Sequence, residues 1–505
     1  MKTNRLFWAA CFAAVLTLSA CGGKEQPAEG GKEQEEPGDK PAEYTITAEE
    51  GWDIYTAGTY RYGPSIIIND DGSIDAWFAA AGSTYAEDYG KRLASTENHT
   101  PLFLANTAVG LAFTSKEPFC SLQACCPTWS TNGTEAMTMA LYRWEDSYEK
   151  TLQGEPVLRR RVTEMQDNAW NMLAKEDGKV PAGRYLLLLN EGTSKAGVWF
   201  APRALNLPEY ELQGYQNGVP VDGAPEVLLM LEKAEDINGS YWDQVSYQHS
   251  TDGGKTWTPE EMVLKPTHGS RDELSCCDPG AIKIGDYYYL GYTSTEHTGG
   301  VENHLYMARS KSPRGPWEKW NGEGWGGSNV QPIVTYTGAK EKWGVGEPSM
   351  VVVDGTLYVY YSWNETVETT RVSTAPADDP LWPAKLTHHG TAINKQGLTA
   401  ADHCDVKYCD EMKKFIAVHT AQRMSKSSFI QIWISSDGKT FQKYKKLTGR
   451  LGGGLHNIGI SGDAQGHIDW NKQQFIAYAY GLDEQGNSSW GRWNTKWNPL
   501  KITKK

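Results

Sequence analysis

The chain has 505 residues, of which 39% are hydrophobic and 11% aromatic, including 20 Trp and 26 Tyr. This length and composition are sufficient for two or three domains with packed cores, and the many aromatic residues favour β-structure. The net charge of -13 excludes nucleic acid and other polyanions as partners, because no excess of Lys and Arg is available to neutralise phosphates, so a neutral ligand is expected.

The first residues predict an export signal. Lys2 and Arg5 precede an apolar stretch, and Leu18-Ser19-Ala20-Cys21 resembles the lipobox at which bacterial lipoprotein signals are cleaved. Residues 1–21 are therefore expected to be a lipoprotein signal peptide and lipobox, with Cys21 as the lipid anchor. An ordinary signal peptide is the alternative.

The next segment predicts a tether. Residues 22–48 are rich in Gly, Glu, Lys and Pro and show no apolar periodicity, so they are expected to be disordered. The protein would then lie at the cell surface or on the periplasmic face, and lipid would be its only contact with the membrane.

A short pattern recurs along the rest of the chain: a turn residue followed by Pro, an apolar run, a turn containing Asp and Gly, and an aromatic-rich run. It begins at Gly63-Pro64-Ser65, at Asp278-Pro279-Gly280 and at Glu347-Pro348-Ser349. Each copy predicts a β-hairpin. Recurrence at blade length is typical of a β-propeller, in which the first strand of each blade lines a common axis. Asp278 and Glu347 are therefore expected to face one pocket.

Two weaker copies complete the series. Residues 404–419 predict a fourth blade, and residues 456–480 predict a fifth. We therefore predict an all-β fold in which residues 49–95 and 235–505 form a five-bladed β-propeller.

The outer strands of the first blade are expected far from its inner hairpin. The run Ser250-Thr251-Asp252-Gly253-Gly254-Lys255-Thr256-Trp257 matches the Asp-box, a structural turn of sialidase-type blades. The intervening residues 96–234 are predicted to form an inserted, jelly-roll-like β-sandwich that is a candidate for carbohydrate binding. Four of its aromatic residues form the expected sugar platform or, alternatively, belong to its core: Trp129, Tyr142, Trp144 and Trp170.

Seven of the nine cysteines follow Cys21, so an odd number lies in the body of the protein. Their connectivity stays open, and the adjacent pairs Cys125-Cys126 and Cys276-Cys277 are candidates for vicinal disulfides. No metal site on the cysteines is predicted, because the Cys-x-x-Cys spacing of zinc ligands is missing.

The run from Asp278 to Tyr289, the strand Tyr306-Met307-Ala308-Arg309-Ser310 and the run Gly346-Glu347-Pro348-Ser349 resemble the five-bladed glycoside hydrolases of the family-43 type, which include arabinanases and xylosidases. That family places a base or nucleophile Asp on the first blade, an orienting or pKa-tuning Asp on the second, and an acid Glu on the third. The resemblance implies that Glu347 is the general acid, that Asp278 holds the second-blade position, and that the substrate is a carbohydrate.

The sequence departs from this family at the first blade, where Gly63 stands in place of Asp. Glycoside hydrolysis needs two carboxyl groups about the anomeric carbon. Either Asp278 is the base, with Asp405 or Asp463 as a third carboxyl, or the chain only binds glycans. We expect a glycosidase acting on oligo- or polysaccharide, with Glu347, Asp278 and Asp405 as catalytic residues. A non-catalytic glycan-binding lipoprotein and a sialidase-like exo-glycosidase are the alternatives.

Several other residues are expected to line the substrate pocket. Tyr60-Arg61-Tyr62-Gly63-Pro64 distantly resembles the sialidase segment whose Arg binds a carboxylate. The expected substrate-binding residues are Arg61, Tyr62, Glu296, Trp363, His456, Asp463 and His467. His456 and His467 are also candidates to hold a structural Ca²⁺ through water, as in some family-43-type enzymes. No other cofactor is predicted.

Overall fold

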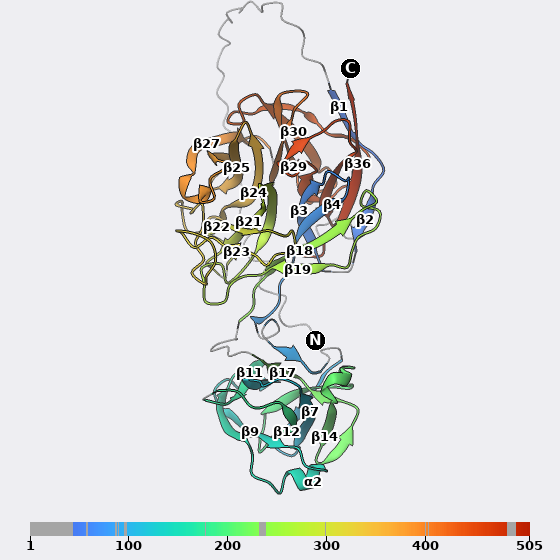
Figure 1. Ribbon diagram of the computed structural model, residues 1–505, viewed down its shortest axis with the longest axis vertical. Helices are drawn as coiled ribbons and strands as arrows, with labels where there is room; N and C mark the ends of the chain where they lie inside the picture. The colour runs from blue at the N-terminus through green and yellow to red at the C-terminus, as the bar shows by residue number, and fades with distance from the viewer. Residues whose placement is uncertain are drawn as a thin grey trace, which may run out of the picture. The chain divides into compact units, whose positions relative to one another are not determined.

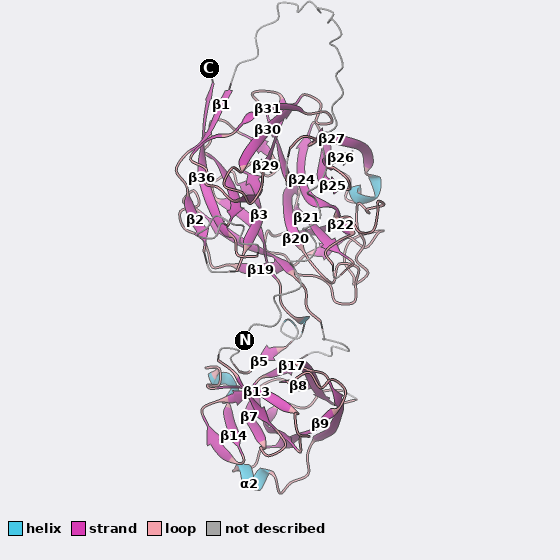
Figure 2. Cartoon of the chain, turned by 180° about the vertical axis from the view of Figure 1, so that it is seen from behind, coloured by secondary structure: helices cyan, strands magenta, loops and turns pink. Residues whose placement is uncertain are grey.

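The computed structural model describes residues 44–504, except 57–58, 86–87, 89, 95–97, 177, 232–238, 298, 399, 402 and 482–490. Regular structure in this part of the chain is almost entirely β-strand, with short helical elements at α2 (Tyr148–Thr151), η1 (Pro208–Tyr210) and η2 (Trp382–Lys385) (Figure 2). The predicted all-β class is confirmed. None of the helices described has the length and apolar character needed to cross a membrane. The expected signal peptide and Cys21 lie outside the described residues.

The repeated hairpins lie in five sets of four antiparallel strands, called sheets below; the second and third sets are continuous with each other, and the fourth and fifth each carry additional strands. Listed from the first strand of each sheet outwards, they are β3 (Arg61–Ile68), β4 (Ile74–Ala81), β18 (Asp243–Ser250) and β19 (Glu261–Leu264); β20 (Cys277–Ile284), β21 (Tyr287–Thr295), β22 (Asn303–Ser310) and β23 (Glu318–Lys319); β24 (Gly344–Val353), β25 (Thr356–Asn364), β26 (Glu368–Pro376) and β27 (Thr387–Asn394); β28 (Cys404–Cys409), β29 (Lys414–Ala421), β30 (Phe429–Ser435) and β31 (Gln442–Lys446); and β33 (Leu455–Ile460), β35 (Gln474–Tyr480), β36 (Asn494–Lys504) and β1 (Tyr44–Ala48). Figure 1 shows the blue strands β3 and β4 beside green β18, which pairs with β4 although about 160 residues separate them.

The first strands of the five sheets form a closed ring. Strand β3 contacts β20, β20 contacts β24, β24 contacts β28, β28 contacts β33, and β33 contacts β3. We call this set of strands the inner ring.

Sequence-local turn chemistry explains the hairpins. Asp354 and Gly355 join β24 to β25 with φ values of 49° and 74°, which is the two-residue turn that Asp-Gly favours. The strands on either side send alternate residues to opposite faces. Val352 shares a core with Ile282 of the second sheet, whereas Val351 shares a core with Val406 of the fourth. Each sheet is thus packed between its two neighbours.

The N-terminal strand completes the fifth sheet. Strand β1 pairs with β36 from Tyr44 opposite Lys504 to Ala48 opposite Leu500 (Figure 1). Tyr44, Ile46 and Ala48 are buried and alternate with half-exposed residues, as expected of an outer strand. Assigning residues 44–48 to a disordered tether was therefore wrong, because their period of two lets them pair and bury one face.

The residues between β4 and β18 form a separate set of sheets. Their strands, in sheet order, are β10 (Leu158–Met165), β9 (Glu135–Arg143), β12 (Gly183–Asn190), β7 (Val109–Ser115), β14 (Gln213–Gln216) and β15 (Val219–Val221); β11 (Ala169–Ala174), β8 (Ser121–Cys126), β17 (Val227–Met230) and β5 (Lys91–Arg92); and β16 (Ala224–Pro225), β13 (Gly197–Ala201) and β6 (Thr100–Phe103). We call this the inserted unit. All three sheets contribute to one hydrophobic core, with Phe113, Leu122 and Val198 as members. Strand β5 begins before residue 96, the expected start of the insertion, because it pairs with β17.

One loop closes an end of the inner ring. Ile68 N–H donates to Gly462 O, Lys283 N–H to Ala464 O, Val352 N–H to Gln465 O, and Tyr408 N–H to Gly466 O. We call residues 462–467 the crossing loop, because it binds four of the five inner strands in turn. Four backbone donors that face the axis are thereby satisfied, which a buried strand end requires.

The seven cysteines after Cys21 are all free thiols in the structure, so neither adjacent pair forms a vicinal disulfide. Burial raises the pKa of Cys126 to about 12, so its thiol stays protonated at neutral pH.

The side chain of Asp252 holds the turn at Ser250–Trp257 together. Asp252 accepts hydrogen bonds from the backbone N–H groups of Lys255 and Thr256, and the Trp257 ring packs 5.0 Å from Trp497. The backbone N–H of Thr256 is the leading cause of a lowered Asp252 pKa of about 2.

Candidate active site

Four inner strands begin with the same backbone feature. Gly63, Asp278, Glu347 and Asn457 have φ values of 57°, 50°, 53° and 34°, and each lies at an interruption of the strand register. Left-handed backbone costs a non-glycine residue about 1–2 kcal/mol, and such strain is often retained at functional sites. This shared feature places the four residues at equivalent positions on their strands.

Asp278 and Glu347 are neighbours in this arrangement. Glu347 N–H donates to Thr293 Oγ1 at 2.7 Å, and Thr293 lies opposite Cys277, the residue before Asp278. A side chain at Gly346 would collide with Thr293, so glycine is what allows this approach. Asp278 and Glu347 are only 4% and 8% exposed. The structure therefore brings these two predicted carboxyl groups together on adjacent inner strands.

Gly63, on the first inner strand, leaves room for a contact between the two strands on either side of it. A Cβ at residue 63 would lie 3.2 Å from Asp278 Cα and 3.6 Å from its Oδ1. Asn457 Nδ2, from the strand on the other side of β3, donates to Asp278 Oδ1 at 3.2 Å. The carboxylate of Asp278 thus points towards the ring axis, and the amide of Asn457 orients it.

An aromatic cluster flanks Asp278. The Tyr62 ring stacks on His456 at 5.6 Å and meets the edge of Trp493 at 5.3 Å, while Tyr60 lies 5.6 Å from Tyr62. Burial, followed by the nearby Asp243, Cys277 and Asp278, raises the pKa of Tyr62, so its hydroxyl remains a neutral hydrogen-bond donor. Two predicted substrate-binding residues, Tyr62 and His456, therefore lie beside the carboxyl pair.

Asp243 is a third carboxyl group near this cluster. It is buried at the start of β18, where Tyr60 Oη donates to its Oδ1 at 2.7 Å and Ser275 Oγ to its Oδ2 at 3.3 Å. Burial raises its pKa to about 6, and hydrogen bonds from Tyr60, Ser275 and Tyr62 oppose that rise. Asp243 is therefore half-protonated in a weakly acidic solution.

Asp243→Asn should remove a pH dependence of stability. The folded protein keeps the Asp243 proton up to about pH 6, whereas the unfolded chain loses it near pH 3.8, so wild-type stability should fall as pH rises through this window. The expected loss is about 2–3 kcal/mol, because one pKa unit corresponds to about 1.36 kcal/mol. Denaturant unfolding at pH 4 and pH 7 measures it. Equal pH dependence in both proteins would contradict the assignment.

A buried ion pair lies near Glu347. Lys395, 1% exposed, pairs with Glu368. Burial disfavours the charged form of Lys395, but Glu368, Cys404 and Glu347 together outweigh it and raise the lysine pKa. Lys395 therefore stays charged and contributes a fixed positive potential on this side of the site.

Asp405 does not join the carboxyl pair. Its Oδ1 accepts from Ser349 Oγ at 2.6 Å and from Lys407 Nζ at 2.7 Å, and its Oδ2 accepts from the Ile460 N–H at 2.8 Å. The prediction of a catalytic role for Asp405 was wrong, because Asp405 lies beside Ser349 and not beside Glu347, which is two residues earlier on β24. There the carboxylate cross-links three inner strands.

Asp463 and His467 lie at the other end of the inner ring, in the crossing loop. That loop meets Lys283 and Val352, which lie five residues beyond Asp278 and Glu347 respectively, or about 16 Å along a strand. Asp463 Oδ1 accepts from the N–H groups of Gln465 and His467 within its own turn. Placing these two residues in the substrate pocket was therefore wrong.

Arg61 also points away from the pocket. Its guanidinium pairs with Glu260 and lies 4.4 Å above the Tyr55 ring. Successive residues of a strand face opposite ways, so Tyr60 and Tyr62 face the cluster and Arg61 does not. The carboxylate-gripping role expected from the sialidase-like segment is wrong for this arginine.

Glu296 and Trp363 lie at the same end of their sheets as the carboxyl pair but are engaged by other residues. Glu296 pairs with Arg271 and lies 3.4 Å from His304 Nε2. Burial is the main cause of a lowered His304 pKa. Trp363 is 8% exposed, with the Arg371 guanidinium 3.7 Å above its ring. Trp363 therefore presents no open face to a sugar, whereas Glu296 is exposed but paired with Arg271.

Three residues near the carboxyl pair were not predicted, and the sequence indicates them to different degrees. Asn457 precedes Gly459 with the spacing that separates Asp278 from Gly280, so this spacing could have identified it. Its signal was obscured because Ile458 replaces the usual Pro. Asp243 at the head of a strand was detectable as a carboxylate but not as a buried one. Trp493 carried no signal.

The described residues contain no group of three or more His, Cys, Asp or Glu side chains placed to hold a metal ion. His467 does not fit the expected Ca²⁺ role, because its Nδ1 contacts Asp410 and its Nε2 contacts Val352 O.

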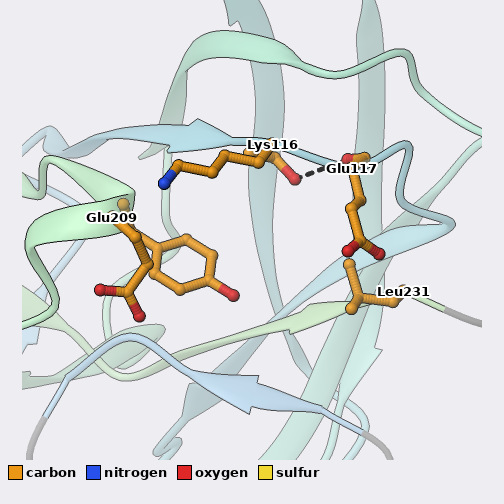
Figure 3. A pocket seen from close by; sticks show the side chains of 6 residues that line it. Lys116, Glu117, Glu209 and Leu231 are labelled. Carbon is orange, nitrogen blue, oxygen red and sulfur yellow. Dashed lines mark hydrogen bonds between the residues drawn. The ribbon is translucent and has the colours of Figure 1, made fainter.

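A hollow of about 220 Å³ lies elsewhere, in the inserted unit. It is lined by Ser115, Lys116, Glu117, Glu209, Tyr210 and Leu231. Figure 3 shows Lys116 Nζ and the Glu209 carboxylate on one side and the Glu117 carboxylate beside Leu231 on the other. None of these residues belongs to the inner ring, so this hollow is separate from the carboxyl pair.

No protein-family model matches the chain, and neither does any curated protein sequence. Solved structures with a similar arrangement include a family 117 glycoside hydrolase from the marine bacterium Zobellia galactanivorans, at 12% identity and a TM-score of 0.41 over 91% of this chain and 90% of that one. An α-L-arabinofuranosidase from Podospora anserina, in complex with cellotriose, aligns at 9% identity and a TM-score of 0.40 over 91% and 97% of the two chains. An endo-arabinase from Bacteroides thetaiotaomicron aligns at 15% identity and 0.34 over 52% and 86%. These neighbours are glycoside hydrolases.

Proposed function

We propose that this protein is a glycoside hydrolase acting on oligo- or polysaccharide, in which the five sheets are the blades of a β-propeller and the inserted unit is a β-sandwich. One observation carries the proposal. Asp278 and Glu347, two buried carboxyl groups, occupy equivalent left-handed positions on adjacent inner strands. Two carboxyl groups at one site are the minimum for glycosidic hydrolysis.

The role of Glu347 follows from the resemblance of its Gly-Glu-Pro-Ser run to the acid-bearing blade, and that of Asp278 from its contact with Asn457. Glu347 donates its proton to the leaving glycosidic oxygen as the bond to the anomeric carbon breaks. Asp278, held by Asn457, accepts the proton of the water that attacks that carbon. Tyr62, His456 and Trp493 offer ring faces and edges to the sugar. Asp243 accepts hydrogen bonds from Tyr60 and Tyr62 and so orients the aromatic cluster.

Location is part of the same proposal. A lipid on Cys21 would hold the propeller outside the cytoplasmic membrane, where large glycans are accessible. No cofactor is required by this chemistry.

The decisive experiment measures turnover. The wild-type protein and the double variant Asp278→Asn/Glu347→Gln are incubated with arabinan, arabinoxylan, xylan and cellulose oligosaccharides, and new reducing ends are counted over time. We expect a steady release by the wild type and none by the double variant, with equal thermal stability as the control for folding. The same rate in both proteins would refute the assignment.

A second function is favoured by Gly63. A carboxylate at this position would complete the family-43-type set, and its replacement by glycine is what a non-catalytic glycan-binding lipoprotein would show. Saccharide binding by the wild type without any release of reducing ends would establish this alternative. We do not propose a sialidase-like activity, because Arg61, the residue expected to bind a substrate carboxylate, pairs with Glu260 instead.

A further inference from the structure

An exposed pair of aromatic rings stands out on the inserted unit. Phe103 and Trp129 are 41% and 44% exposed, and their ring centres are 5.1 Å apart at an angle of 47°. The other large hydrophobic side chains exposed on the described part of this unit are Val157 and Val219. Single exposed hydrophobic side chains are common on protein surfaces. Two exposed aromatic rings in contact form a contiguous apolar patch, and such patches mark binding sites.

A stack of rings supports this pair from behind. Trp199 lies 6.0 Å from Trp129 at 28°, and His99 stacks on Trp199 at 4.4 Å and 15°. Val198 and Phe200 on either side of Trp199 are buried in the core, so the alternation of β13 turns Trp199 outward.

Polar contacts fix this stack. Trp199 Nε1 donates to Asn168 Oδ1 at 2.8 Å. His99 Nδ1 lies 3.2 Å from an oxygen of Glu226, which is 4% exposed and also pairs with Arg92. A buried carboxylate with two partners holds the imidazole in one orientation. The rings are therefore set before any ligand arrives.

The loop that carries Trp129 is held in a strained conformation. Trp129 and Ser130 have φ values of 52° and 64°, at a cost of about 1–2 kcal/mol for each residue. Thr128 N–H donates to Asp167 Oδ1 at 2.6 Å, and Thr131 Oγ1 donates to Thr128 O at 2.6 Å, so the loop is fixed on both sides of the Trp. A rigid aromatic side chain binds a ligand with little loss of side-chain entropy.

We propose that Phe103 and Trp129, supported by Trp199 and His99, form a binding site for a neutral saccharide chain, distinct from the carboxyl pair. A pyranose or furanose has an apolar C–H face for the rings and hydroxyl groups for polar neighbours. The exposed amide of Asn168 is a suitable partner, because its Oδ1 is used by Trp199 and its Nδ2 can donate to a hydroxyl.

Other occupants fit less well. A stable protein interface buries about 800 Å² on each partner, far more than two side chains provide. Nucleic acid would need a positive surface to accompany the rings, and the chain carries a net charge of -13.

The site differs from the platform expected from sequence. Of that set only Trp129 belongs to it: Tyr142 and Trp144 pack around Tyr148 and Tyr215, and Trp170 lies under the Arg92 guanidinium. The two sets of residues therefore make different predictions for mutagenesis.

The test is affinity electrophoresis of the full chain in native gels that contain soluble xylan, arabinan, arabinoxylan or mixed-linkage β-glucan. The Asp278→Asn/Glu347→Gln variant is the parent, so that no polysaccharide is hydrolysed. On that background Trp129→Ala and Phe103→Ala should each weaken retardation by at least one of these polysaccharides about five- to tenfold. Trp144→Ala and Val219→Ala are the matched controls and should bind like the parent.

Three results would overturn the proposal: a parent that none of the four polysaccharides retards, Trp129→Ala binding like the parent, or loss of binding in Trp144→Ala alone. Thermal unfolding of each variant separates lost binding from lost folding. In the active protein, Trp129→Ala should leave hydrolysis of small aryl glycosides unchanged, so this site and the proposed glycosidase function succeed or fail separately.

Discussion

Glu347→Gln should reduce polysaccharide hydrolysis by about 10²- to 10⁴-fold, the usual contribution of a general acid. Glutamine keeps the size of the side chain, and the bond to Thr293 Oγ1 comes from the Glu347 backbone, so the fold should be unaffected. The loss should depend on the leaving group. A sugar hydroxyl needs a proton to depart, whereas 4-nitrophenolate is stable as an anion, so 4-nitrophenyl glycosides should be hydrolysed with a much smaller loss.

The control for this prediction is Glu341→Gln, an exposed glutamate six residues earlier in the chain. It should retain wild-type rates on both kinds of substrate. Equal losses in Glu347→Gln for polysaccharide and 4-nitrophenyl glycoside would contradict the role of general acid, and unchanged activity would remove Glu347 from the mechanism.

Lys407→Met should lower the free energy of unfolding by about 3–5 kcal/mol, the range for removing one partner of a buried ion pair. The side chains of Lys407 and Asp405 are only 6% and 7% exposed. Methionine retains much of the aliphatic stem of Lys407, which lies close to Gly462 of the crossing loop. The carboxylate of Asp405 would then be buried with only the Ser349 hydroxyl and the Ile460 N–H as donors.

Denaturant unfolding measures this loss, with Lys150→Met as the matched control. Lys150 pairs with Asp146 on the surface, where the two side chains are 55% and 84% exposed, so its removal should have no measurable effect. If Lys407→Met were as stable as the wild type, Asp405 would not be the inter-strand link described above. Its catalytic role would then have to be reconsidered.

Features encoded locally were predictable from sequence. The Asp354-Gly355 turn predicts its hairpin, because few residues adopt the two positive φ values that the turn needs. The X-Pro-Gly and X-Pro-Ser runs placed Asp278 and Glu347 in the same register, and the structure brings them together.

Features that depend on pairing between distant segments were not predictable in this way. The burial of Asp243 follows from β18 packing beside β4, and the insertion separates the two strands by about 160 residues. The sequence pattern aligned Asp405 with Glu347, whereas in the structure it lies beside Ser349, two residues further along β24. Strand β28 has no bulge, so this register had no marker. Nothing in the sequence around His467 indicates that its loop crosses the far end of the ring, since that depends on which inner strands present free N–H groups.

The proposed hydrolysis requires a single sugar ring to lie between Asp278 and Glu347. The direct measurement is a crystal structure of Glu347→Gln with an oligosaccharide that the wild-type protein hydrolyses. We expect a glycosidic oxygen within hydrogen-bonding distance of the side chain of residue 347, with Asp278 facing the adjacent anomeric carbon. An oligosaccharide bound only at Phe103 and Trp129, or one that leaves both carboxyl positions untouched, would contradict it.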